Sequence, residues 1–187
     1  MPIHTRPLTY PDLEQARETT AERLELIGGE LFVTPAPIPF HQMVSLRLTR
    51  FLDAAVSARS GGLVFYAPVD VRLDEHKVVQ PDLIVLLGDR IRLVGEKNIE
   101  GPPTLVIEIA SPSTGTRDRE MKRDLYARFG VLEYWLVDPD AQTVTIFSEP
   151  VHGRYQREAT TSERATSTTI QGLSVDLAAL FAPIAKG

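Results

Sequence analysis

Two carboxylates in apolar surroundings are the first sign of chemistry in this 187-residue sequence. Asp82 follows Pro81 at the start of the run PDLIVLL, and Glu108 lies within the run TLVIEIA. An ionised carboxylate among such residues is costly unless a cation or a metal ion pairs with it. If the two runs form neighbouring strands, the pair predicts an oxygen-ligand site for Mg²⁺ or Mn²⁺. Lys122, on a predicted helix further along the chain, would complete a site that cleaves phosphodiesters.

Helical and strand patterns alternate along the chain, which predicts an α/β protein with one mixed sheet packed by helices. Helices are expected over residues 10–22, 41–58 and 118–129, and the segment LELIGGELFVTP predicts a β-hairpin that turns at two glycines. The helix over 118–129 joins the strands TLVIEIAS and EYWLVD, as a right-handed crossover between parallel strands would. No helix or strand is predicted for the polar segment 157–169.

The length favours a single domain over residues 1–187, large enough to bury a core of its own. Within it, residues 1–40 are expected to form an N-terminal helix and hairpin extension. Residues 41–148 would form the core, and residues 149–187 a C-terminal extension.

Composition excludes several kinds of protein. The chain has no cysteine, which rules out disulfides, thiolate zinc sites and cysteine nucleophiles and fits a cytoplasmic location. Its four histidines are scattered, which disfavours a histidine-built zinc site. No apolar run approaches membrane-spanning length, so we expect no membrane association. The net charge of −5 argues against a dedicated nucleic-acid coat, although a local basic strip occupies TRDREMKRDLYAR.

The helix over 118–129 places three polar residues on one face. Asp118, Lys122 and Tyr126 recur at intervals of four, beside an apolar stripe. From there the lysine could reach back to Glu108 on the sheet. The alternative is that Lys122 pairs with Asp118 and extends its ammonium into solvent.

Three long motifs carry a resemblance to a known family. The segments VVQPDLIVL, PPTLVIEIASPST and DREMKRDLYARFGVLEYWLVDPD resemble the Uma-type family of restriction endonucleases, within the PD-(D/E)XK nuclease superfamily. The resemblance implies a restriction-endonuclease-like fold with an N-terminal hairpin extension and a homodimer that hydrolyses DNA with Mg²⁺ or Mn²⁺. It also implies that Asp82 and Glu108 hold the metal and that Lys122 stabilises the phosphate charge. The sequence departs from the superfamily at Ala110, where a lysine usually stands.

The sequence contains further candidate site residues, for which a purely structural role explains the residue at least as well as a catalytic role. Glu25 and Glu30 both match acidic positions of the family pattern, and of the two Glu30 is the preferred addition to the metal site. His41 opens the second predicted helix and could approach the cleft or simply lie at the surface. Gln80 precedes the Pro-Asp pair and could orient a water molecule.

Two alternatives stay open beside the DNA nuclease. The same chemistry could act on RNA or a small nucleotide, or the protein could have no catalytic function. The same fold could persist as a catalytically inactive module for DNA binding or protein interaction. Ala110 and the acidic balance of the chain favour this alternative, whereas the combination of Asp82, Glu108 and Lys122 favours the enzyme.

Overall fold

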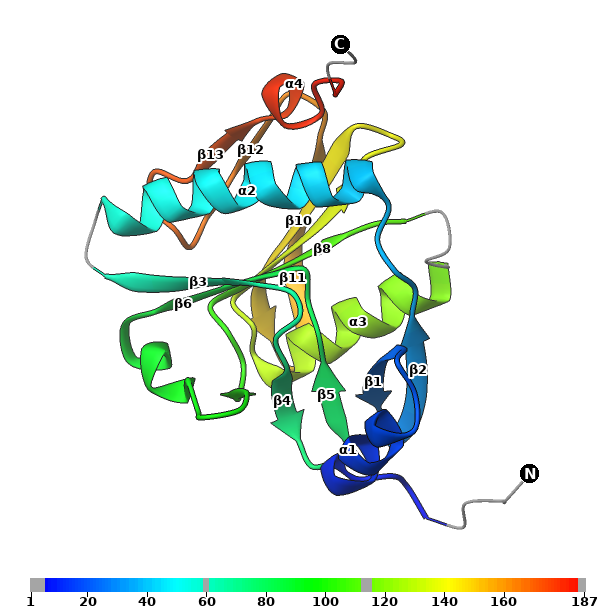
Figure 1. Cartoon of the computed structure of the whole chain (residues 1–187). Coiled ribbons are helices and arrows are strands. Elements are labelled where there is room, and N and C mark those ends of the chain that lie inside the picture. The colour runs from blue at the N-terminus through cyan, green and yellow to red at the C-terminus, as the bar shows by residue number, and fades with distance from the viewer. Residues whose placement is uncertain (1–5, 59–60, 112–115, 185–187) are drawn as a thin grey trace.

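A six-stranded mixed sheet, here called the central sheet, has helices against both of its faces (Figure 1). The computed structural model describes residues 6–58, 61–111 and 116–184, and for residues 116–118 it describes the backbone alone. The helices are α1 (Tyr10–Glu18), α2 (Pro39–Ser57), α3 (Thr116–Phe129) and α4 (Leu177–Leu180), with a 3₁₀ turn η1 (Gly88–Leu93). The strands are β1 (Arg23–Ile27), β2 (Glu30–Thr34), β3 (Gly62–Tyr66), β4 (Val71–Asp74), β5 (Lys77–Val79), β6 (Leu83–Leu87), β7 (Ile99–Glu100), β8 (Leu105–Ile109), β9 (Glu133–Asp138), β10 (Thr143–Val151), β11 (Arg154–Thr161), β12 (Arg164–Thr166) and β13 (Ser174–Asp176).

The central sheet has the strand order β11-β10-β9-β8-β6-β3. Strands β8 and β9 are parallel, and every other neighbouring pair in this sheet is antiparallel. Helix α3 connects β8 to β9, which confirms the predicted helical connection between two parallel strands. The predicted mixed α/β class is confirmed, but the expectation of one sheet is wrong, because the strands of the described residues form three sheets of five, six and two strands.

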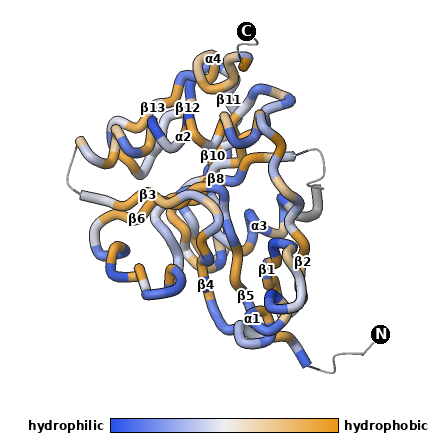
Figure 2. The backbone as a smooth tube through the Cα atoms, in the orientation of Figure 1, coloured by the Kyte–Doolittle hydropathy of each residue, from blue (hydrophilic) through white to orange (hydrophobic). Residues whose placement is uncertain are grey.

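Side chains alternate between the two faces of the central sheet, as the period of a strand requires. In β6, Leu83 and Val85 pack against α2, whereas Ile84 and Leu86 pack on the side of α3. All five residues of this strand are strongly apolar, and the tube through β6 is coloured accordingly in Figure 2. The strand is covered on both faces, which is why its sequence is a continuous apolar run.

A second sheet, here called the hairpin sheet, brings the N-terminal segment to the central sheet. Its strand order is β2-β1-β5-β4-β7, and β1 joins β5 through the pairing of Leu26 with Val78. The predicted hairpin is confirmed, with its turn at Gly28 and Gly29, which both have positive φ. The hairpin is therefore built into a sheet and does not project as an appendage.

Two sequence expectations about elements are corrected by the structure. Helix α1 ends at Glu18 instead of continuing to residue 22, because threonines follow and the Thr19 hydroxyl donates to the Ala16 carbonyl. The polar segment 157–169 contributes to strands β11 and β12. Strand β11 lies at an edge of the central sheet and is mostly exposed, so no apolar alternation marks it in the sequence. Across residues 6–58, 61–111 and 116–184, none of the helices combines the length and the apolar character needed to span a bilayer.

Candidate active site

Asp82 and Glu108 lie on neighbouring strands. Asp82 immediately precedes β6, and β6 pairs with β8, which carries Glu108, through the register of Leu83 with Ile107. One oxygen of Asp82, Oδ2, accepts a hydrogen bond of 2.7 Å from the backbone N–H of Ile109, the residue after Glu108. The two carboxylates therefore meet at one end of the sheet, as the sequence predicts.

Lys122 reaches back from α3 to the sheet. Its Nζ lies 3.1 Å from Oε1 of Glu108, and the Tyr126 hydroxyl donates to the same oxygen at 2.6 Å. Only 8% of the Lys122 side chain is exposed, so its ammonium does not extend into solvent. The predicted helical face thus points its lysine and its tyrosine at Glu108. The side chain of Asp118, the third residue of that face, lies outside the described part of the chain.

Glu25, and not Glu30, is the glutamate of the hairpin that joins this cluster. Its Oε2 lies 2.9 Å from the Lys122 Nζ, and 4% of its side chain is exposed. Its other oxygen accepts a hydrogen bond of 2.6 Å from the backbone N–H of Gln80. Glu30 is exposed at the start of β2, although it lines the same cavity. Glu25 reaches the cluster because β1 turns its side chain towards α3, whereas the preference for Glu30 in the metal site stays a prediction.

His41 approaches the site from the first turns of α2. Its Nε2 lies 3.3 Å from Oδ2 of Asp82, and its buried Nδ1 has no hydrogen-bond partner among the described residues. Burial disfavours the charged imidazole, but the hydrogen bond and the charge of Asp82 outweigh it. The net effect raises the pKa of His41 above its usual value. The histidine is therefore placed to hold the orientation of the Asp82 carboxylate.

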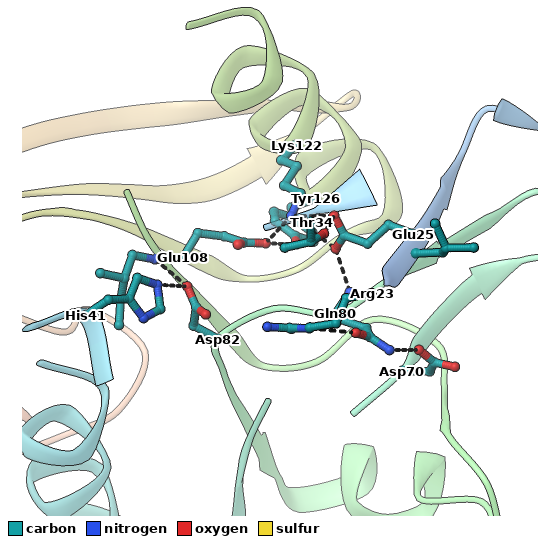
Figure 3. Close-up of polar contacts among 12 residues, drawn as sticks. Arg23, Glu25, Thr34, His41, Asp70, Gln80, Asp82, Glu108, Lys122 and Tyr126 are labelled. Atoms are coloured by element: carbon teal, nitrogen blue, oxygen red, sulfur yellow. Dashed lines mark hydrogen bonds and ion pairs between the residues drawn. The ribbon is translucent and has the colours of Figure 1, made fainter. Parts of the chain in front are cut away.

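The side chain of Gln80 is hydrogen-bonded to protein groups at both of its ends, which leaves it poorly suited to orient a water molecule. Its Nε2 donates to Asp70 at 2.8 Å, and its Oε1 accepts from Nε of Arg23 at 3.3 Å. Asp70 in turn accepts two hydrogen bonds from Arg17, of 2.6 and 2.9 Å. The expected role of Gln80 in orienting water is therefore not supported. The hydrogen bonds of Gln80 instead connect the hairpin sheet to the loop that carries Asp82 (Figure 3).

The polar cluster opens into a cavity of about 920 Å³. It is lined by the charged residues Glu25, Asp82, Glu108 and Lys122, here together called its floor, and also by His41 and Arg119. A volume of this size lies within the range of about 300–1,000 Å³ that is common for ligand sites. The cluster is therefore accessible to a ligand instead of being sealed inside the core.

Negative charge exceeds positive charge on this floor. Burial raises the pKa of Glu108 to about 7; the charges of Glu25 and Asp82 add to this effect, and the ammonium of Lys122 opposes it. A carboxyl group whose pKa is displaced towards neutrality by its surroundings is typical of functional sites. A bound cation would relieve the excess of negative charge.

The donor atoms of Asp82 and Glu108 fit a hard divalent cation. Carboxylate oxygens are the ligands that Mg²⁺ prefers, and Mn²⁺ accepts the same set. Among the residues that the structure describes, no three His, Asp or Glu side chains are grouped closely enough to form a metal site by themselves. Magnesium commonly keeps several water ligands and is held by one or two carboxylates with substrate phosphates, so two carboxylates suffice.

The displaced pKa of Glu108 predicts how stability depends on pH in metal-free buffer. A carboxyl group whose pKa rises from 4.5 to about 7 on folding binds more protons in the folded state. Its contribution to stability is complete below pH 4.5 and is lost as the pH rises through about 7. We expect the free energy of unfolding to fall by about 2–3 kcal/mol between pH 5 and pH 7.5.

Urea denaturation in the presence of a chelator would measure this slope. The Glu108→Gln protein has no proton to lose at this position and should show a flatter dependence on pH. If the parent protein and the variant lose stability equally over this range, another group is responsible for the slope.

The protein resembles known proteins over nearly its whole length. The Uma2 family profile, described as "putative restriction endonuclease", matches residues 9–179. No curated protein matches the chain significantly. Among solved structures, the crystal structure of a protein described as a "putative nuclease" from Anabaena variabilis is similar, with a TM-score of 0.75 and 21% identity. The similarity covers 94% of this chain and 98% of that chain, and it confirms the fold. Because the family match includes the hairpin and the strands that carry both carboxylates, this protein belongs to the Uma2 family of restriction-endonuclease-like proteins.

Proposed function

We propose that this protein is a Mg²⁺- or Mn²⁺-dependent endonuclease that hydrolyses phosphodiester bonds of DNA. The observation that carries the proposal is the position of Lys122. Its buried ammonium lies between Glu25 and Glu108, at the edge of a cavity that also exposes Asp82. Membership of a family of restriction-endonuclease-like proteins supports the reaction class.

The proposed roles follow from the positions of the side chains. Asp82 and Glu108 would hold the metal ion, which when bound polarises the scissile phosphate and lowers the pKa of a water molecule. Lys122 would stabilise the negative charge that develops on the phosphate oxygens. It would thereby replace the lysine that is missing at Ala110, whose methyl side chain also lines the cavity. His41 and Tyr126 would position Asp82 and Glu108, since each forms a short polar contact with one of them.

The reaction is a simple exchange of bonds at phosphorus. The oxygen of the attacking water forms a bond to phosphorus, and the bond from phosphorus to one sugar oxygen breaks. One proton of the water ends on the departing sugar oxygen as an alcohol. The products are a free hydroxyl end and a phosphate monoester end, and no oxidant or cosubstrate is needed.

The expected result of a cleavage assay is metal-dependent nicking of plasmid DNA or oligonucleotides. Activity should require Mg²⁺ or Mn²⁺, disappear with a chelator, and fall to the level of the buffer blank in the Asp82→Ala and Glu108→Ala proteins. Asp89→Ala is a matched control, because Asp89 is exposed and does not line the cavity. Equal cleavage by the parent protein and both active-site variants would remove these residues from the mechanism.

The alternative function, an inactive module with a nuclease fold, has one observation in its favour. No lysine follows Glu108 at the usual position, and Lys122 already neutralises part of the acidic cluster. Calorimetric titration with Mn²⁺ separates the two functions. An enzyme should show a Mn²⁺ site that the Glu108→Ala change abolishes, whereas an inactive module should show none.

The identity of the substrate as DNA, the homodimer and the cytoplasmic location remain predictions. The first two come from the family resemblance, and the third comes from the absence of cysteine. Sedimentation of the purified protein would test the homodimer directly.

A further inference from the structure

An apolar segment lines the cavity together with its charged floor. This segment, here called the hairpin wall, consists of Phe32, Val33 and residues 35–38, which belong to β2 and the segment that leads into α2. Val33 and Ile38 each leave 55% of their surface exposed. Single exposed apolar residues are common, but a continuous run beside a polar cluster is typical of a surface that contacts a ligand.

Arg119 supplies a positive group to the same cavity. It lies one helical turn before Lys122 on α3, so the two cations point to the same side of the helix. Its buried Nε has no hydrogen-bond partner among the described residues, and one of its terminal nitrogens lies 3.6 Å from a carboxylate oxygen of Asp138. A guanidinium group with unused donors can bind a phosphate through two parallel hydrogen bonds.

The distribution of charge and apolar surface disfavours a B-form duplex as the occupant. Proteins that bind duplex DNA usually present a broad, strongly positive surface of about 1,000–2,500 Å². Here the net charge is −5, and the cations of the site are gathered in one cavity of about 920 Å³ with an apolar side. Paired bases would turn only their sugars and phosphates towards such a cavity, and the hairpin wall would have no apolar partner.

An unpaired strand matches both surfaces. Its phosphates carry the charge that Arg119 and Lys122 can bind, and its unstacked bases offer apolar faces to the hairpin wall. We propose that the cavity binds an unpaired strand of nucleic acid, with Arg119 on a phosphate next to the scissile one and Val33 and Ile38 against the bases. The proposal rests on the proposed nuclease function, because it places the strand across the same carboxylates.

Fluorescence anisotropy with Ca²⁺ in place of Mg²⁺ or Mn²⁺ keeps a cation on the carboxylates and measures binding apart from cleavage. The probes are a labelled 12-nucleotide single strand of DNA, the same sequence as a blunt duplex, and the equivalent RNA strand, all at one salt concentration. We expect the DNA single strand to bind at least about tenfold more tightly than the duplex. Equally tight binding of the RNA strand would also support an unpaired strand as the ligand.

Three variants separate the two surfaces. Arg119→Gln should weaken single-strand binding about tenfold and reduce the dependence on salt by about one phosphate contact. The double change Val33→Ser and Ile38→Ser should weaken binding while leaving the salt dependence unchanged. Arg123→Gln is the matched control on the same helix, since Arg123 does not line the cavity, and it should bind like the parent protein.

The binding assay tests the ligand site and the cleavage assay tests the nuclease function, so each proposal can be contradicted without the other. If the duplex binds as tightly as the single strand, or if Arg119→Gln has no effect, the inference is overturned even when cleavage is observed. Strand binding with the predicted variant effects, but without cleavage under any metal condition, would support this ligand site and contradict the nuclease function.

Discussion

Replacing Lys122 with methionine is expected to lower the free energy of unfolding by about 3–5 kcal/mol at pH 8. The change removes a cation that lies 2.9 Å from Glu25 and 3.1 Å from Glu108, and both carboxylates are largely buried. Methionine keeps most of the side-chain volume, so the loss would reflect charge and not a cavity. Cleavage should fall by at least about 100-fold, because the charge opposite the phosphate is lost.

The loss of stability in this variant should be smaller at pH 5 than at pH 8. Burial raises the pKa of Glu108 to about 7, so at pH 5 this carboxyl group is mostly protonated and has less need of a cation. Urea denaturation at the two pH values, in a chelator, measures the difference.

Lys97→Met is the control, because 75% of that side chain is exposed and its Nζ lies 3.7 Å from Glu14. It should cost less than about 1 kcal/mol. A Lys122→Met penalty that does not change with pH would point to packing as its source.

Replacing Glu25 with glutamine is expected to reduce turnover without changing the concentration of Mg²⁺ that gives half-maximal activity. Glu25 contacts the Lys122 ammonium and the Gln80 backbone, so we infer that it positions the lysine and does not hold the metal. The amide cannot offer both of its ends as acceptors, and the variant should lose about 2 kcal/mol of stability. Asp82→Asn, by contrast, should shift the dependence on Mg²⁺ because Asp82 is a proposed ligand.

Glu22→Gln is the matched control for this prediction. Glu22 has the same chemistry and immediately precedes β1, but it is exposed and does not line the cavity. It should leave both stability and turnover within error of the parent protein. A Glu25→Gln protein whose Mg²⁺ dependence shifts as much as that of Asp82→Asn would make Glu25 a metal ligand and contradict the positioning role.

Local sequence patterns were sufficient to locate the centre of the site. Asp82 and Glu108 stand out because one carries a charge directly before an apolar strand and the other within one, and the period of β8 turns Glu108 towards α3. The interval of four residues between Lys122 and Tyr126 places both on one face of α3, and both contact Glu108. These positions follow from local geometry, whereas the catalytic roles remain predictions.

Positions that depend on distant pairing were harder to predict. Glu25 lies in the run RLELI and is as unusual there as Glu108 is in its own strand, so the same signal was present in the sequence. Its role was hidden because its partner lies 97 residues away. The side-chain partners of Gln80 likewise lie on strand β1 and in the loop before β4, and its sequence position next to Asp82 suggested a different role.

The long separation between Glu25 and its partners also sets the order in which the site can form during synthesis. The ribosome adds Gln80 55 residues after Glu25, and it adds Lys122 97 residues after Glu25. Until α3 has emerged, Glu25 must remain hydrated, because a carboxylate without its cation cannot be buried cheaply. The hairpin that carries Glu25 is thus completed only after α3 has been synthesised, and the charged cluster of the candidate site cannot form before that point.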